Sequence, residues 1–71
     1  MIISRIRDLR EDHDYTQAEI AEHLHISQPA YSYYETGERA IPLELLIQLA
    51  RFYNTSVDYI LGETDNPKRY D

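Results

Sequence analysis

Residues 15–35, which read YTQAEIAEHLHISQPAYSYYE, contain two helix-start signals with the same layout. In the first signal, Thr16 precedes a helical pattern and Glu19 follows three residues later, which predicts a capping box. In the second signal, Ser27 is a favourable capping residue, and Pro29 falls in the first helical turn, where a proline sacrifices no hydrogen bond. Because only residues 25–27 separate the two patterns, the spacing predicts two short helices joined by a tight turn, a helix-turn-helix.

Hydrophobic spacing and stop signals predict five helices in all. The helix-turn-helix covers about residues 17–36, with helices over 17–24 and 28–35, the second ending before Gly37. A first helix is expected over about residues 2–13, with Ile2, Ile6 and Leu9 facing the core. Two more helices are expected over about residues 42–53, opening with Pro42, and over residues 57–61, after the capping residue Ser56.

Composition favours an all-α domain over residues 1–62, followed by a polar and flexible tail over residues 63–71. The chain has two glycines, three prolines and no alternating β-type pattern. It has no cysteine, no apolar run near the roughly 20 residues that span a bilayer, and early charges that do not suit a secretory signal. We therefore expect a cytoplasmic protein without disulfides that does not bind membranes.

The helix expected over residues 42–53 is apolar nearly all round. One stripe, made of Leu43, Leu46, Ala50 and Tyr53, is enough to face a core. A second apolar stripe therefore needs another packing surface, and a second copy of the chain is one candidate. We predict a dimer patch on this stripe, made of Leu45, Leu49 and Phe52.

Enzyme and metal chemistry find no support in the sequence. His13, His23 and His25 lack the i, i+4 spacing of helical metal ligands. No nucleophile–base pair, glycine-rich phosphate loop or pair of catalytic carboxylates can be singled out. We therefore expect a non-enzymatic protein with no metal site and no cofactor.

Four segments in order resemble the Cro/phage-repressor-like helix-turn-helix family, also called the xenobiotic-response-element type. The resemblance covers residues 5–62 without a gap. Its motifs are RIRDLR at 5–10, TQAEIA at 16–21, YETGER at 34–39 and SVDYILG at 56–62. The resemblance implies a compact five-helix, lambda-repressor-like fold and a sequence-specific transcriptional regulator, typically a repressor that binds near-palindromic double-stranded DNA as a dimer.

The same resemblance implies roles for individual residues. Gln17 matches a phosphate contact, and Arg39 matches a loop residue that touches the DNA backbone. Arg10 and Glu35 match an internal ion pair between the first and third helices. The positions that face the major groove are Ser27, Gln28, Pro29, Ser32 and Tyr33.

The residue chemistry agrees with part of this assignment. The amide of Gln28 can bond adenine N6 and N7 together, whereas Ser27 acts either as a cap alone or also as a DNA contact. Two positions depart from the family pattern: His25 replaces the usual turn glycine, and Tyr33 replaces a frequent basic residue.

A second hypothesis uses the same fold as a protein-interaction module, antitoxin-like or regulator-binding, with weak or lost DNA binding. The net charge of -6 and a third helix without Lys or Arg support it, since nucleic-acid binders usually carry a basic surface. Gln17, Gln28 and Arg39 speak against it, because all three fall in DNA-contact positions.

Overall fold

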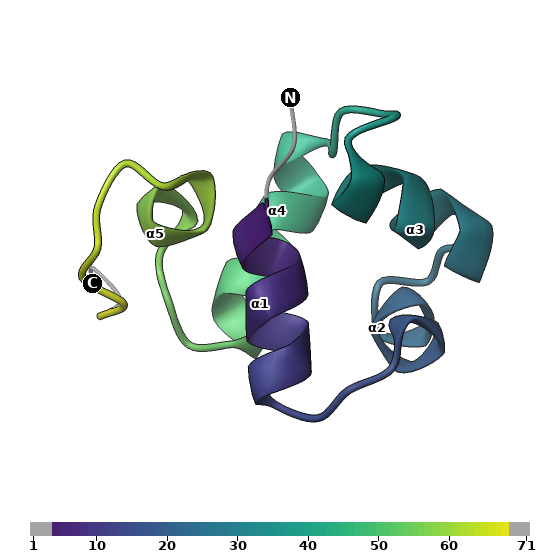
Figure 1. The fold of residues 1–71 in the computed structure, drawn as a ribbon, viewed down its shortest axis with the longest axis horizontal. Helices are drawn as coiled ribbons and strands as arrows, with labels where there is room; N and C mark the ends of the chain where they lie inside the picture. Colours follow the sequence, from purple (N-terminus) through teal and green to yellow (C-terminus); the bar gives the residue numbers. More distant parts are fainter. Residues whose placement is uncertain (1–3, 69–71) are drawn as a thin grey trace.

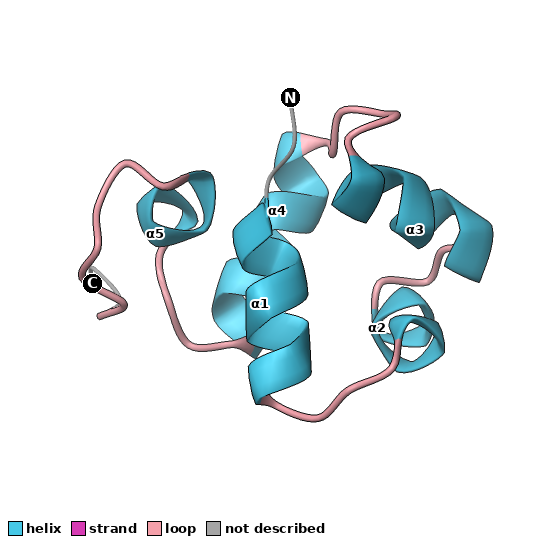
Figure 2. Ribbon diagram, in the orientation of Figure 1, coloured by secondary structure: helices cyan, strands magenta, loops and turns pink. Residues whose placement is uncertain are grey.

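The computed structural model describes residues 4–68, which form five helices joined by short loops, with no strand among these residues (Figures 1 and 2). The all-α prediction is confirmed. The predicted helix start at Ile2 lies outside the described residues. The helices are α1 (Ser4–Asp12), α2 (Gln17–His23), α3 (Gln28–Thr36), α4 (Leu43–Phe52) and α5 (Val57–Leu61).

Side-chain caps start three of the helices, as the sequence predicts. The Glu19 N–H donates to Thr16 Oγ1 over 3.1 Å while the Thr16 N–H donates to Glu19 Oε1 over 2.9 Å, which completes the capping box of α2. Ser27 Oγ accepts from the Ala30 N–H at the start of α3, and Ser56 Oγ accepts from the Tyr59 N–H at the start of α5. Pro42 is the capping position of α4 and makes no side-chain cap bond.

A left-handed residue follows each of the five described helices. Asp14, His25 and Asn54 have φ of 59°, 59° and 54°, and Gly37 and Gly62 have φ of 81° and 82°. His25 therefore adopts, in the turn between α2 and α3, the conformation that glycine usually supplies, and it does so at a steric cost.

The core is built from every helix, and α4 contributes more buried residues to it than any other helix. Its fully buried large side chains are Tyr31, Ile6, Ile20, Leu49 and Ile60. One prediction about α4 is wrong: Leu43 is 63% exposed, and the buried stripe runs through Leu46, Leu49, Ala50 and Tyr53. These positions are spaced i, i+3, i+4 and i+7, so they form one helix face, whereas Leu43 lies at the margin of that face in the first turn.

α1 runs through the middle of the molecule. α2 and α3 lie on one side of it, and α5 lies on the other (Figure 1). α1 packs against both α3 and α5, while α2 packs on α3 and α4 packs on α5. This arrangement leaves α3 at one end of the domain, with one face free of other helices.

The described part of the tail is attached to the body of the domain. Arg5 of α1 donates to the carbonyls of Tyr59 and Thr64, each over 3.1 Å, and its Nη2 lies 2.8 Å from Asp65 Oδ1. Thr55 Oγ1 donates to the Pro67 carbonyl over 2.7 Å. The sequence predicts none of these contacts.

Among residues 4–68, no helix combines the length and the apolar character that a membrane crossing requires.

Candidate nucleic-acid interface

α3 divides into a buried face and an outward face. Tyr31 and Glu35 are buried and Tyr34 is partly buried against the core. The outward face carries small or polar side chains and one aromatic ring. Its residues are Gln28, Pro29, Ser32, Tyr33 and Thr36. Ser32 is partly buried, and the other four are exposed. This division places every predicted groove-facing residue of α3 on the outward side.

Ser27 lies immediately before this face, with its hydroxyl oxygen accepting from Ala30 N–H over 3.2 Å. The hydroxyl hydrogen keeps its own donor capacity, so capping and a contact to another acceptor are compatible. Pro29, in the first turn, removes an N–H that would have no helical partner and presents a short apolar surface.

Glu35 joins three helices through its carboxylate. Arg10 of α1 donates to both carboxylate oxygens, with Nε 2.7 Å from Oε2 and Nη2 3.2 Å from Oε1. Gln17 of α2 donates its Nε2 to Oε1 over 3.0 Å. We call these residues, Arg10, Gln17 and Glu35, the Glu35 network.

The Glu35 network keeps the carboxylate charged. Burial by itself raises the pKa of Glu35, but the Arg10 hydrogen bond, the adjacent Tyr31 hydroxyl and the Gln17 hydrogen bond lower the pKa below its ordinary value. The same hydrogen bond to Glu35 raises the pKa of Arg10 further. The charge of Glu35 is therefore neutralised inside the domain and adds little repulsion toward an anion at α3.

Gln17, predicted as a phosphate contact, has its side-chain amide oriented by Glu35. One of its two Nε2 hydrogens is used in that bond, which leaves a second hydrogen available. Gln17 lines a surface pocket of about 350 Å³ together with Arg7, Arg10, Glu35 and Thr36. Arg7 and Thr36 are additions that the sequence analysis missed, because their place beside Gln17 depends on how α1 packs on α3.

Arg39 lies in the loop that follows α3, and its guanidinium carbon is 4.9 Å from the centroid of the Tyr33 ring. This distance is typical of a cation–π contact. The Arg39 N–H also donates to the Tyr33 carbonyl over 3.3 Å. The structure therefore gives the outward side of α3 the positive charge that its own sequence lacks.

The predicted dimer patch does not form one exposed surface. Leu49 has no exposed area and belongs to the core, while Leu45 and Phe52 are half-buried and pack against it. Phe52 lies between the rings of Tyr15 and His23, with centroids 5.2 and 4.2 Å away. The apolar side chains of α4 that do reach the surface are Leu43 and Ile47.

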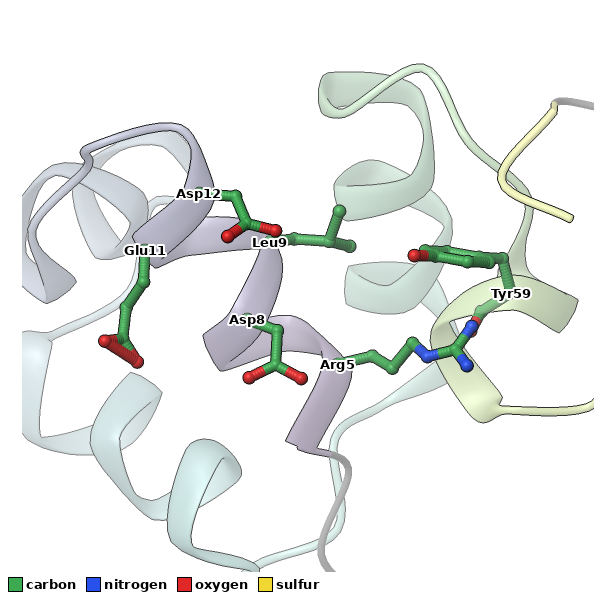
Figure 3. Close-up of a pocket in the computed structure, with 6 residues that line it drawn as sticks. All are labelled: Arg5, Asp8, Leu9, Glu11, Asp12 and Tyr59. Atoms are coloured by element: carbon green, nitrogen blue, oxygen red, sulfur yellow. The ribbon is translucent and has the colours of Figure 1, made fainter. Parts of the chain in front are cut away.

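An acidic groove lies along α1 on the side of α5. Figure 3 shows Asp8, Glu11 and Asp12 projecting from α1, with the Arg5 side chain reaching the Tyr59 ring. The guanidinium carbon of Arg5 is 4.2 Å from that ring's centroid. The acids account for much of the negative charge in the first half of the chain, and they belong to α1 rather than to α3.

Comparison with known proteins places this geometry in a family. Residues 6–60 match the family model described as "Helix-turn-helix". The chain is 45% identical over 67 residues to the uncharacterized HTH-type transcriptional regulator YobD of Bacillus subtilis (strain 168), covering 94% of this chain and 60% of that protein. It is 32% identical over 65 residues to the cryptic phage CTXphi transcriptional repressor RstR of Vibrio cholerae, covering 92% of this chain and 59% of that protein.

A third relative is named for a different role. The antitoxin PezA of Streptococcus pneumoniae serotype 4 is 38% identical over 63 residues, covering 89% of this chain and 40% of that protein. The chain thus spans between two fifths and three fifths of the length of these three relatives. The matched model, the order of the helices and the capped turn between α2 and α3 together show that the chain belongs to the Cro/repressor-type helix-turn-helix family.

Proposed function

We propose that this chain binds a specific double-stranded DNA sequence by placing α3 in the major groove, and that it regulates transcription in this way, as a repressor. The observation that carries the proposal is the outward face of α3, which presents hydrogen-bonding side chains and no core function. A major groove admits one α-helix, and its base edges are read by such side chains. A protein that binds DNA in this way would be intracellular and DNA-associated.

Gln28 is the residue proposed to read a base. It is exposed in the first turn of α3, and no hydrogen bond to another described residue engages its side chain. Its amide offers one donor and one acceptor side by side, which matches adenine N7 and N6. Ser32 lies one helical turn further along and would contact the next bases or the backbone.

Phosphate contacts are proposed for Gln17, Arg7 and Thr36, which line one pocket, and for Arg39 in the loop after α3. The spare amide hydrogen of Gln17 and the exposed guanidinium of Arg7 can both donate to a phosphate oxygen. The number of cations is small, so the proposal includes a shallow salt dependence of binding.

Selection of sequences from a random double-stranded DNA pool tests the proposal. We expect one near-palindromic motif to be enriched, and we expect Gln28→Ala to weaken binding to it by about 1–3 kcal/mol. Gln48→Ala is the matched control, because Gln48 is an exposed glutamine on α4. Failure to enrich any motif at low salt would contradict DNA recognition.

The proposal includes a homodimer that docks through the groove between α4 and α5 in place of the predicted patch. Ile47 and Val57 supply apolar surface in this groove, and Arg51 and Asp58 supply opposite charges. In a twofold dimer, Arg51 of one copy would face Asp58 of the other copy, and the reverse pair would form as well. This surface is therefore self-complementary. Two copies would then read two half-sites about one helical turn apart.

Sedimentation measurements test this dimer. Ile47→Lys should give a monomer, whereas Leu45→Lys tests the half-buried stripe that the sequence favoured. Arg51→Asp alone should weaken the dimer, and the charge swap Arg51→Asp with Asp58→Arg should restore it. A dimer unaffected by Ile47→Lys would exclude this groove.

A second candidate function is binding of a protein partner through the acidic surface of α1. The groove lined by Asp8, Glu11 and Asp12, the net charge of -6 and the antitoxin relative favour it. A basic partner segment would complement this charge. Reversing charge at Asp8 and Asp12 should abolish such binding and leave the DNA motif unchanged, since neither residue lies near the outward face of α3.

A further inference from the structure

We propose that Tyr33 is a positioning residue for Arg39: its ring holds the guanidinium beside the outward face of α3, ready to bind a DNA phosphate. This inference rests on the proposed DNA binding and goes further, because it gives Tyr33 the role of holding the Arg39 side chain in place.

The geometry fixes Arg39 at two points. Its backbone N–H donates to the Tyr33 carbonyl over 3.3 Å, and its guanidinium carbon lies 4.9 Å from the Tyr33 ring centroid. Gly37, with φ of 81°, reverses the chain between them. The backbone bond does not depend on the side chain at residue 33, so a substitution there removes the ring contact alone.

The surroundings of the Arg39 guanidinium differ from those of the α1 arginines. Arg5, Arg7 and Arg10 each lie within 4 Å of a carboxylate, whereas no carboxylate of residues 4–68 lies within that distance of Arg39. Arg39 and Tyr33 are both exposed. The guanidinium is therefore held by a ring, which takes up none of its N–H donors, and the donors remain available to an anion.

A phosphate is the ligand that fits these donors. The planar guanidinium forms two parallel hydrogen bonds with a phosphate, and DNA presents phosphates on both sides of a helix in its groove. Ordering the long Arg39 side chain before binding also lowers the entropy that binding would otherwise cost.

A direct contact of Tyr33 with DNA is the competing explanation, and a double-mutant cycle separates the two. Tyr33→Leu removes the ring, Tyr33→Phe keeps the ring without the hydroxyl, and Arg39→Ala removes the cation. Binding of each variant to the selected DNA is measured by fluorescence anisotropy at several salt concentrations.

We expect Tyr33→Leu to weaken binding about two- to fivefold, the range of an exposed cation–π contact. Tyr33→Phe should bind like the parent chain, and Arg39→Ala should lower the salt slope by about one. In the R39A background, Tyr33→Leu should have no further effect. Equal losses from Tyr33→Leu in both backgrounds, or a loss from Tyr33→Phe as large as that from Tyr33→Leu, would overturn the proposal.

A measurement without DNA keeps this inference separate from the proposed function. The Tyr33 ring should shift the Arg39 side-chain proton resonances upfield in the NMR spectrum, and Tyr33→Leu should abolish the shift while Tyr33→Phe preserves it. Absence of the shift overturns the ring contact even if DNA binds. Failure of the parent chain to bind any DNA overturns the function even if the shift is present.

Discussion

Arg10 and Glu35 form an ion pair that fastens α1 to α3, with Arg10 Nε 2.7 Å from Glu35 Oε2. The two side chains are only 14% and 3% exposed. Because Gln17 binds the same carboxylate, the position of α3 relative to both α1 and α2 depends on one buried charge. The outward face of α3 can be rigid for this reason, although the helix has neighbours on one side only.

Removing one partner of this pair should destabilise the domain strongly. Glu35→Gln leaves a poorly solvated guanidinium without its counter-charge, and we expect a loss of about 3 kcal/mol in the free energy of unfolding, measured by urea denaturation. The double variant Arg10→Met with Glu35→Leu should recover much of that loss, because no unpaired charge remains. Arg7→Met, which breaks an exposed pair with Glu11, is the control and should have a far smaller effect. If the double variant loses as much stability as Arg10→Met alone and Glu35→Leu alone added together, this account is contradicted.

Acid should unfold the domain through Glu35. The pKa of Glu35 is lowered in the folded state, so its stabilising contribution is complete above the ordinary glutamate pKa of about 4.3 and is lost as pH falls through the folded-state pKa. The free energy of unfolding should therefore fall below about pH 4. Glu35→Gln should flatten the fall, and an acid profile that the substitution leaves unchanged would exclude Glu35 as its source.

Alkali should unfold the domain through two buried phenols. Burial, reinforced by the Glu35 carboxylate, raises the pKa of Tyr31, and burial likewise raises the pKa of Tyr53. Since each folded-state pKa is raised, stability is complete below about pH 10, the ordinary tyrosine pKa, and is lost as pH rises above it.

Tyr31→Phe should move this alkaline loss to higher pH. At pH 7 it should change stability by less than about 1 kcal/mol, because the buried Tyr31 hydroxyl lies near the Glu35 carboxylate but has no partner in hydrogen-bonding geometry among the described residues. Tyr33→Phe, which removes a hydroxyl from an exposed ring, is the control for the alkaline stability profile and for the stability at pH 7. A large loss at pH 7 would show that the Tyr31 hydroxyl makes a bond that the structure does not contain.

Arg5→Met should release residues 63–68 from the domain. The substitution removes the hydrogen bonds to the Tyr59 and Thr64 carbonyls and the ion pair with Asp65. Heteronuclear NOE values for the amides of Thr64, Asp65, Asn66 and Lys68 should fall, while those of α3 stay unchanged. Asp65→Asn removes the ion pair alone and should have a smaller effect; equal NOE values in Arg5→Met and the parent chain would refute the attachment.

Local chemistry explains why much of the fold could be predicted. Thr16, Ser27 and Ser56 cap helices through bonds that span three residues, so neighbouring sequence is sufficient to identify them. Asp14, His25 and Asn54 end helices by adopting positive φ, which is also a local property. The helix over residues 57–61 was predicted with its observed bounds for the same reason.

The candidate site was less accessible to prediction wherever it depends on distant residues. Two stripes of α4 are apolar, and only the packing of α4 into the core, with α5 against it, decides that Leu49 is buried and Leu43 is exposed. The pocket beside Gln17 needs Arg7 from α1, and residues 63–68 are held by Arg5, which lies about 60 positions earlier. These outcomes follow from contacts between elements that no local pattern encodes.

The sequence alone therefore determined where the helices begin and end, because capping and left-handed turns act within a few residues. Only the tertiary structure decided which side chains are buried, paired or exposed, because this depends on how those helices pack together. Packing turned Glu35 into the neutralised centre of the Glu35 network, and the reversal at Gly37 brought Arg39 over Tyr33. A helix without a basic residue of its own thereby acquires a positive charge at its outward face, because a folded chain can supply from a loop what the helix itself lacks.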